Sequence, residues 1–213
     1  MNAGREEPLC LRQPQVSAQP DHATLWEMQP DHARLRATYD ELLKVPNHLV
    51  AEILDGELHV NPRPAPRHAD ASSGLGGALR GPFDRGRGGP GGWRILDEPE
   101  LHLAADVLVP DLAGWRRERL PALPEQAYFD LAPDWVCEVL SPSTASMDRV
   151  KKLSIYAREQ VRHAWLVDPL VRTIEILRLE NAHWTIAATF ADLDIVRAEP
   201  FAAMELDLSL LWD

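Results

Sequence analysis

Alternating apolar and polar positions give the clearest local signal in the first third of the chain. Residues 49–54 and 57–60 are two strand-like runs separated by Asp55-Gly56. Two such runs around an Asp-Gly pair are typical of a β-hairpin with a two-residue turn. Just upstream, residues 34–43 are expected to form a short helix that stops before Pro46.

The middle of the chain combines one helical segment with several short apolar runs. A helix is predicted over about 69–79, and a glycine-rich turn follows at 86–92. The glycine-rich run lacks the Gly-Lys-Ser/Thr ending of a phosphate-binding loop. Apolar runs bounded by Gly, Pro and Asp then predict strands at 93–96, 100–103 and 107–112.

The second half of the chain has the pattern of a strand–helix–strand unit. An apolar run at 135–140 is followed by a helical pattern at 148–159 and another apolar run at 163–167. These lengths suit a crossover between two parallel strands. Residues 171–179 and 183–190 predict a second hairpin. The sequence therefore predicts an α/β fold with a mixed β-sheet flanked by helices and with additional β-hairpins.

Composition agrees with one folded domain. The 213 residues are 45% hydrophobic and 26% charged, as in ordinary globular proteins that bury a core. Residues 1–30 hold scattered Pro, Gln and Glu without periodicity, so we expect a disordered tail and a single domain over 31–213. No apolar run approaches the ~20 residues that cross a bilayer, and no signal-peptide pattern is visible, so we expect a cytoplasmic protein without membrane association. Cys10 and Cys137 support neither a disulfide framework nor a thiolate metal site.

Charge is spread unevenly along the chain. The net charge is −11, which is unfavourable for a protein that binds phosphate groups through Lys and Arg. The window 61–96, however, holds six arginines against Asp70 and Asp84, so it carries +4 and leaves −15 on the rest. This window predicts either a local basic face or an arginine-rich solvated loop, and the sequence does not decide between them.

Two carboxylates lie within otherwise apolar strand segments. Glu138 shares one strand face with Val136 and Leu140, and a carboxylate is costly to bury there unless it is paired or binds a cation. Asp111 follows Pro110, which marks a strand edge, end or bulge. An arginine ion pair and a simple strand end are the structural alternatives. Together, the two carboxylates favour a Mg²⁺ site, because this ion prefers oxygen ligands and leaves room for water and a phosphate oxygen.

The predicted helix at 148–159 adds a cation. Asp148, Lys152 and Tyr156 are spaced i, i+4 and i+8, so they share one helix face. They could form a surface Asp–Lys pair worth roughly a few tenths of a kcal/mol. Alternatively, Lys152 points at the carboxylates, where it would orient a water or stabilise charge on a phosphate. Lys151 points about 100° away around the helix, so Lys152 is preferred.

Several motifs occur together in this chain: Glu52 before Asp55-Gly56-Glu57-Leu58, then Pro64-Ala65-Pro66-Arg67-His68, Val109-Pro110-Asp111, Glu138 to Thr144, Asp148 through Lys152 to Tyr156, and Trp165 to Pro169. In these motifs the chain resembles the Uma-type family of putative restriction endonucleases, part of the PD-(D/E)XK nuclease superfamily. The resemblance covers about residues 34–190, and the segment from Glu138 to Thr144 with its downstream Lys and Tyr is specific.

The resemblance implies a restriction-endonuclease-like core and a set of catalytic residues. Asp111 and Glu138 would ligate Mg²⁺, with Mn²⁺ as the alternative ion, and Glu52 matches an acidic residue that assists the site. The superfamily has lysine two residues after the glutamate, whereas this chain has Leu140 there. Lys152 on the next helix would therefore stand in for the superfamily's lysine.

Two further residues match the family pattern without a settled role. His68 could support the site from a short distance or serve the structure at the start of a helix. Tyr156 could hydrogen-bond near the site or pack against the sheet.

The predicted function is a metal-dependent endonuclease that hydrolyses DNA phosphodiester bonds, with Asp111, Glu138, Lys152 and Glu52 as catalytic residues. Cleavage of a duplex needs two sites, which favours a homodimer. The alternative is a nuclease-fold module that binds partners without cleaving, because a fold does not fix a function. A metal-dependent hydrolase for another substrate is a third option.

Overall fold

The structure is a computed structural model that describes residue 1 and residues 36–212. The chain divides into two units, Met1–Arg34 and Leu35–Asp213, and every helix and strand given below belongs to the second. The disordered tail expected over 1–30 lies, apart from Met1, outside the described residues. Within the described part of the chain, no helix has the length and apolar character needed to cross a membrane.

A four-stranded antiparallel sheet contains the predicted first hairpin. Its strand order is β2-β1-β5-β4, and the strands are β1 (Leu49–Leu54), β2 (Glu57–Pro62), β4 (Leu101–Leu103) and β5 (Asp106–Leu108). The β1–β2 turn is Asp55-Gly56, with φ angles of 54° and 83°. Positive φ at both turn residues is the geometry that an Asp-Gly pair accommodates at low cost.

A six-stranded mixed sheet forms the centre of the unit, in the order β10-β9-β8-β7-β6-β3. The strands β7 and β8 are parallel, and the other neighbouring pairs are antiparallel. The predicted crossover and the α/β class with a mixed sheet are thus confirmed. The bounds are β3 (Trp93–Asp97), β6 (Leu112–Arg116), β7 (Trp135–Val139), β8 (His163–Asp168), β9 (Thr173–Glu180) and β10 (His183–Ala191).

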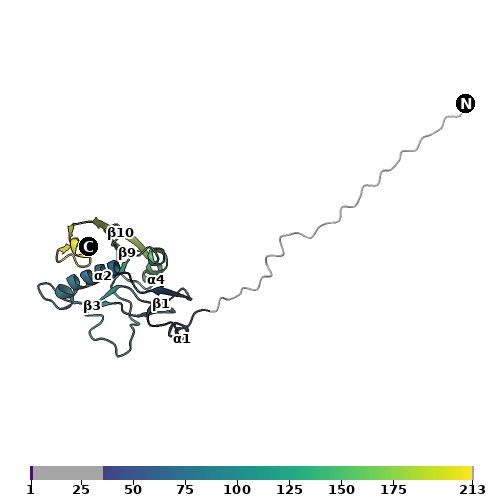
Figure 1. Cartoon of the computed structure of the whole chain (residues 1–213), viewed down its shortest axis with the longest axis horizontal. Coiled ribbons are helices and arrows are strands. Elements are labelled where there is room, and N and C mark those ends of the chain that lie inside the picture. The colour runs from purple at the N-terminus through teal and green to yellow at the C-terminus, as the bar shows by residue number, and fades with distance from the viewer. Residues whose placement is uncertain (2–35, 213) are drawn as a thin grey trace. The chain divides into compact units, whose positions relative to one another are not determined.

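Helices cover both faces of this sheet (Figure 1). On one face lies α2 (Pro66–Leu79), which continues into the wide π-type turn η2 (Arg80–Asp84). On the other lies a helical segment in three parts, α3 (Ala145–Met147), the π-type turn η3 (Asp148–Lys152) and α4 (Leu153–Arg158). The short helix α1 (Tyr39–Leu42) packs by the four-stranded sheet.

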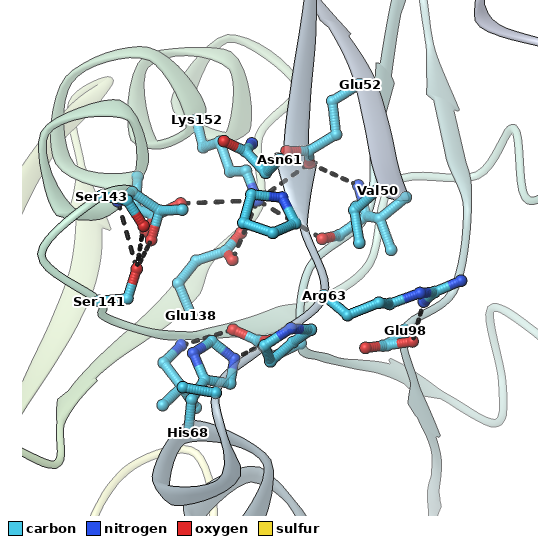
Figure 2. A pocket seen from close by; sticks show the side chains of 18 of the residues that line it. Val50, Glu52, Asn61, Arg63, His68, Glu98, Glu138, Ser141, Ser143 and Lys152 are labelled. Atoms are coloured by element: carbon cyan, nitrogen blue, oxygen red, sulfur yellow. Dashed lines mark hydrogen bonds and ion pairs between the residues drawn. The ribbon is translucent and has the colours of Figure 1, made fainter. Parts of the chain in front are cut away.

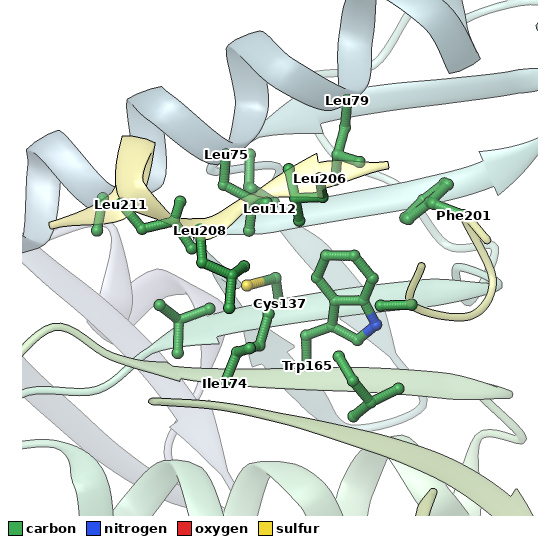
Figure 3. Packing of buried hydrophobic residues seen from close by; sticks show 14 of the residues in the cluster. Leu75, Leu79, Leu112, Cys137, Trp165, Ile174, Phe201, Leu206, Leu208 and Leu211 are labelled. Carbon is green, nitrogen blue, oxygen red and sulfur yellow. The ribbon is translucent and has the colours of Figure 1, made fainter. Parts of the chain in front are cut away.

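The strand β7 divides the core, as its alternation predicts. Trp135, Cys137 and Val139 pack with α2 and the C-terminal segment, whereas Val136 packs with α4 on the other face. Figure 3 shows Leu75 and other α2 side chains over the first of these faces. Glu138 projects to the same side as Val136, where the end of the strand meets the four-stranded sheet.

The C-terminal segment was not anticipated from the sequence. It forms β11 (Ile195–Val196), β12 (Leu206–Asp207) and the 3-10 helix η4 (Leu208–Leu211). Leu208 and Leu211 are buried against the core cluster that contains α2 (Figure 3). Elements of two to four residues are too short to give a periodic signal.

Three predicted boundaries are wrong for identifiable reasons. The single strand expected at 107–112 is two strands, since β5 ends at Leu108 and β6 begins at Leu112 with Pro110 between them. The helix expected from residue 34 begins only at Tyr39, because Thr38 caps it together with Glu41. The helix expected from residue 69 begins at Pro66, where proline's fixed φ suits the first helical turn.

Candidate active site

A cavity of about 260 Å³ lies where the two sheets approach each other. Its walls come from β1 and β2, the start of α2, the segment between β5 and β6, the end of β7, and the turn and helix after β7. Figure 2 shows Glu52, Glu138 and Lys152 pointing toward one another inside it. The buried or half-buried ionisable residues that line it are Glu52, His68, Asp111, Glu138, Asp148 and Lys152.

Glu138 is fixed near the end of β7 by two donors. One carboxylate oxygen, Oε2, lies 3.2 Å from the Lys152 Nζ atom, and the other, Oε1, accepts a 2.6 Å hydrogen bond from the Tyr156 hydroxyl. The residue is only 2% exposed. Burial raises the pKa of Glu138 well above its usual range, although the nearby Lys152 opposes that shift. This carboxylate is therefore oriented and desolvated, and a nearby positive charge stabilises its ionised form.

Lys152 is surrounded by oxygen atoms. Its Nζ atom lies 2.9 Å from Glu52 and 3.6 Å from Asp148, in addition to the contact with Glu138, and it donates to the Val109 carbonyl at 3.4 Å. Burial by itself lowers the pKa of Lys152, but the surrounding carboxylates outweigh it and hold the pKa well above its usual value. The ammonium thus stays charged in a buried position.

Asp111 reaches the same cavity from the break between β5 and β6. Its Oδ2 atom accepts a 2.7 Å hydrogen bond from the Val139 backbone N–H, and its Oδ1 atom lies 2.7 Å from His68 Nε2. The chain leaves strand pairing after Leu108, and the segment through Pro110 presents this carboxylate beside the end of β7.

Glu52 lies on β1, in the other sheet. One oxygen of its carboxylate accepts a hydrogen bond from the Val109 backbone N–H at 2.8 Å and also contacts Lys152. The four residues expected to act together from the sequence, Glu52, Asp111, Glu138 and Lys152, therefore line one cavity.

The π-type turn η3 positions the helical groups. It spans Asp148–Lys152, and both end residues are buried beside the cavity. A surface Asp–Lys pair is therefore not what the structure contains. Lys151 faces elsewhere, where it contacts Glu57 at 2.8 Å. The preference for Lys152 over Lys151 agrees with these positions.

Three further residues contribute more to the site than the sequence pattern indicated. Asp148 is buried and belongs to the carboxylate group around Lys152, and burial raises its pKa. Tyr156 does not only pack, because its hydroxyl donates to Glu138. His68 contacts Asp111 directly. The helix face that Asp148 and Tyr156 share with Lys152 indicated from the sequence that both could lie at the site. The partner of His68 lies 43 residues away, so no local sequence pattern indicated that contact.

The charge balance of the cavity suits a divalent cation. If all are ionised, its four buried or half-buried carboxylates outnumber the Lys152 ammonium by three charges. Within residues 36–212, no three His, Cys, Asp or Glu side chains form a preassembled metal cage, since the acids gather around the lysine instead. Carboxylate oxygens have lone pairs beyond those used by their donors, so Asp111 and Glu138 fit the donor set of a hard cation such as Mg²⁺.

The arginine-rich window does not form a concentrated basic face. Arg63 pairs with Glu98, Arg80 pairs with Asp97, and Arg94 donates to two backbone carbonyls. Among the described arginines of this window, Arg67, Arg85 and Arg87 have no such side-chain partner. Internal pairing thus takes up half of the arginines that suggested a basic face.

A solved structure shares this architecture. The crystal structure of a putative nuclease belonging to DUF820 from Anabaena variabilis ATCC 29413 superposes with a TM-score of 0.67 and 23% sequence identity. The match covers 82% of this chain and 97% of that one. No curated protein matches the sequence. The structural match shows that this chain shares the fold of that putative nuclease.

The family model agrees with the fold. Residues 36–210 match the model named Uma2, which is described as a putative restriction endonuclease. The matched range includes every site residue described above and well over half of the sequence. The resemblance seen in the short motifs is therefore confirmed, and the chain belongs to the Uma2 family of putative restriction endonucleases.

Proposed function

We propose that this protein is a metal-dependent endonuclease that hydrolyses DNA phosphodiester bonds. The observation that carries the proposal is the buried Lys152 ammonium, in contact with Glu138 and Glu52 in a cavity that Asp111 also lines. The Asp111 and Glu138 carboxylates would provide the ligands for a cation, and Lys152 would provide a fixed positive charge for a phosphate. Membership of the Uma2 family and the nuclease-like fold support this function.

Asp111 and Glu138 would hold a divalent ion, Mg²⁺ or alternatively Mn²⁺. Bound there, the ion would supply Lewis acidity and a water of lowered pKa. Each carboxylate is oriented by two donors and keeps further lone pairs with which it would bind the ion.

Lys152 would act on the reacting phosphate. In hydrolysis a water oxygen bonds to phosphorus, one P–O ester bond breaks, and the leaving oxygen takes up a proton. The ammonium would orient the attacking water or stabilise the negative charge that develops on the phosphate oxygens. Glu52 would keep Lys152 in place, since its carboxylate contacts the ammonium and is itself held by the Val109 amide.

The first test measures metal binding and cleavage separately. Mg²⁺ or Mn²⁺ should raise the melting temperature, and Asp111→Ala or Glu138→Ala should remove that increase. Plasmid DNA should be cut in Mg²⁺ by the wild type and not by Lys152→Ala. Lys151→Ala is the matched control, because the neighbouring lysine contacts Glu57 outside the cavity, and it should cut normally. Normal cleavage by Lys152→Ala would overturn the proposal.

A second function is favoured by the electrostatics. The chain carries a net charge of −11, and half of the arginines in the window 61–96 are held by internal partners. These facts suit a nuclease-fold module that binds a partner without cleaving DNA. Metal-dependent stabilisation without cleavage of any duplex, single-stranded or structured DNA would support the module and contradict the endonuclease.

A homodimer would have two sites, one for each strand of a DNA duplex. Sedimentation with and without a short DNA duplex tests this arrangement. A protein that stays monomeric on DNA and yet produces double-strand breaks would contradict it.

A further inference from the structure

His68 makes a contact that the proposed reaction does not use. Its Nε2 atom lies 2.7 Å from Asp111 Oδ1, and the two side chains are 12% and 15% exposed. Both residues line the cavity, and Figure 2 shows the His68 ring extending from α2 beneath Glu138. The pair is therefore part of the cavity wall, unlike a histidine–carboxylate pair sealed inside a core.

The direction of this hydrogen bond follows from chemistry. An ionised carboxylate only accepts, so the Nε2 atom of His68 must carry the proton and donate it. The other Asp111 oxygen accepts from the Val139 backbone N–H. One donor therefore holds each oxygen of Asp111, and together they fix the plane of the carboxylate.

The donor on His68 is held by a helix that the core fixes in place. His68 lies in the first turn of α2, and the same helix buries Ala71, Leu75 and Leu79 against the six-stranded sheet. Asp111, in contrast, lies in the irregular segment between β5 and β6. The rigid helix can thus orient a carboxylate that its own backbone leaves less constrained.

We propose that His68 is a positioning residue that orients Asp111 for cation binding. The proposal rests on the proposed function, in which Asp111 ligates the ion. Ligating carboxylates are commonly held by such hydrogen bonds, and loss of the partner typically weakens metal affinity by about 10–100-fold. The His68 imidazole does not itself touch the ion or the substrate in this role.

The test compares two substitutions at this position in the full-length protein. His68→Leu removes the donor and should weaken Mn²⁺ affinity by about 10-fold or more, measured from the electron paramagnetic resonance signal of free Mn²⁺. His68→Gln keeps an N–H donor at a similar reach and should restore affinity to within about 3-fold of the wild type. Equal affinity in wild type and His68→Leu, or no rescue by His68→Gln, would overturn the proposal.

His102 provides a matched control. Its Nε2 atom lies 2.7 Å from Glu100 Oε1, the same separation as in the His68–Asp111 pair, but His102 does not line the cavity. His102→Leu should leave Mn²⁺ affinity unchanged. A similar loss of affinity in His102→Leu would show a general effect on folding and would contradict a specific role for His68.

A metal-free measurement separates failure of this inference from failure of the proposed function. The ¹³C carboxyl resonance of Asp111 should shift in His68→Leu and return toward the wild-type position in His68→Gln. If the wild type binds no Mn²⁺, the proposed function fails, and this resonance still decides whether His68 orients Asp111. An unchanged resonance in His68→Leu would overturn the positioning role.

Discussion

Lys152 serves in this structure as the counter-ion of a buried group of acids. Glu52, Glu138 and Asp148 each lie within 3.6 Å of its Nζ atom. Removing one partner from a buried ion pair costs about 3–5 kcal/mol, because the remaining charge is left uncompensated. The lysine therefore contributes both to folding stability and to the chemistry proposed for the site.

Lys152→Met should lower the melting temperature in EDTA and increase the stabilisation gained from Mn²⁺. The uncompensated carboxylates would then bind a cation more strongly, because no ammonium competes for their oxygens. Thermal unfolding with EDTA and with Mn²⁺ measures both effects. Lys151→Met is the control and should change stability by about 1 kcal/mol or less, since its pair with Glu57 is partly exposed. Equal Mn²⁺ stabilisation of wild type and Lys152→Met would contradict the prediction.

Glu138 should make the metal-free protein less stable as the pH rises. Burial raises its pKa above the usual value of 4.5, so the folded protein favours the protonated form. The stability from this group is full below the unfolded-state pKa and is lost as the pH rises through the higher folded-state pKa.

Glu138→Gln removes this ionisation and should therefore flatten the decline in stability above about pH 4.5. Urea unfolding in EDTA at pH 5 and pH 8 measures the difference between variant and wild type. A steeper decline in the variant would contradict the sign of the shift.

At the scale of elements, α2 joins the cavity to the core. Its first turn carries His68, and its later residues pack against the sheet and the C-terminal segment. The helix contains glycines in very different surroundings. A Cβ atom at Gly74 would lie 2.5 Å from the Leu210 backbone oxygen, whereas at Gly77 it would meet nothing within 4 Å.

Gly77→Ala should stabilise the protein by about 0.5–1 kcal/mol, because alanine favours a helix over glycine. Gly74→Ala should destabilise it, because the added methyl group pushes α2 away from η4. Urea unfolding of the two single variants measures these opposite effects on one helix. A stabilising Gly74→Ala would show that η4 moves freely and does not hold α2.

An element can be predicted from the sequence when residues close to it in the chain determine its structure. The hairpin at β1 and β2 follows from Asp55-Gly56 and its flanking alternation, and the two faces of β7 follow from period-two patterning. The division between β5 and β6 was missed because Pro110 is compatible with a strand edge as well as with an interruption. The wide turn η3 was also missed, since helical spacing in a sequence does not distinguish a π-type turn from an α-helical one.

At the scale of the whole molecule, the charge distribution limits how DNA could bind. The net charge is −11, and of the six described arginines in the window 61–96 only Arg67, Arg85 and Arg87 lack an internal hydrogen-bond or ion-pair partner for the side chain. A surface formed by this window would therefore release few counterions on binding DNA. The cation in the site would then supply a large share of the attraction to phosphate.

DNA affinity should therefore require a divalent ion and depend weakly on monovalent salt. With Ca²⁺ as a hard cation suited to carboxylate ligands, the slope of log affinity against log salt should be about −3 or shallower. Gel-shift titrations from 50 to 200 mM salt measure it, with EDTA as the reference. A slope near −6, or equal affinity in EDTA, would show that a basic surface binds DNA without the ion.

The sequence by itself determined the α/β class, the two hairpins, the buried position of Glu138 and the common helix face of Asp148, Lys152 and Tyr156. These follow from periodicity and turn chemistry over a few residues. Only the tertiary structure decided which groups meet: Glu52 comes from a different sheet, and His68 reaches Asp111 across 43 positions. It also decided that half of the window's arginines have internal partners. Such contacts depend on how sheets and helices pack, and no local pattern records that packing.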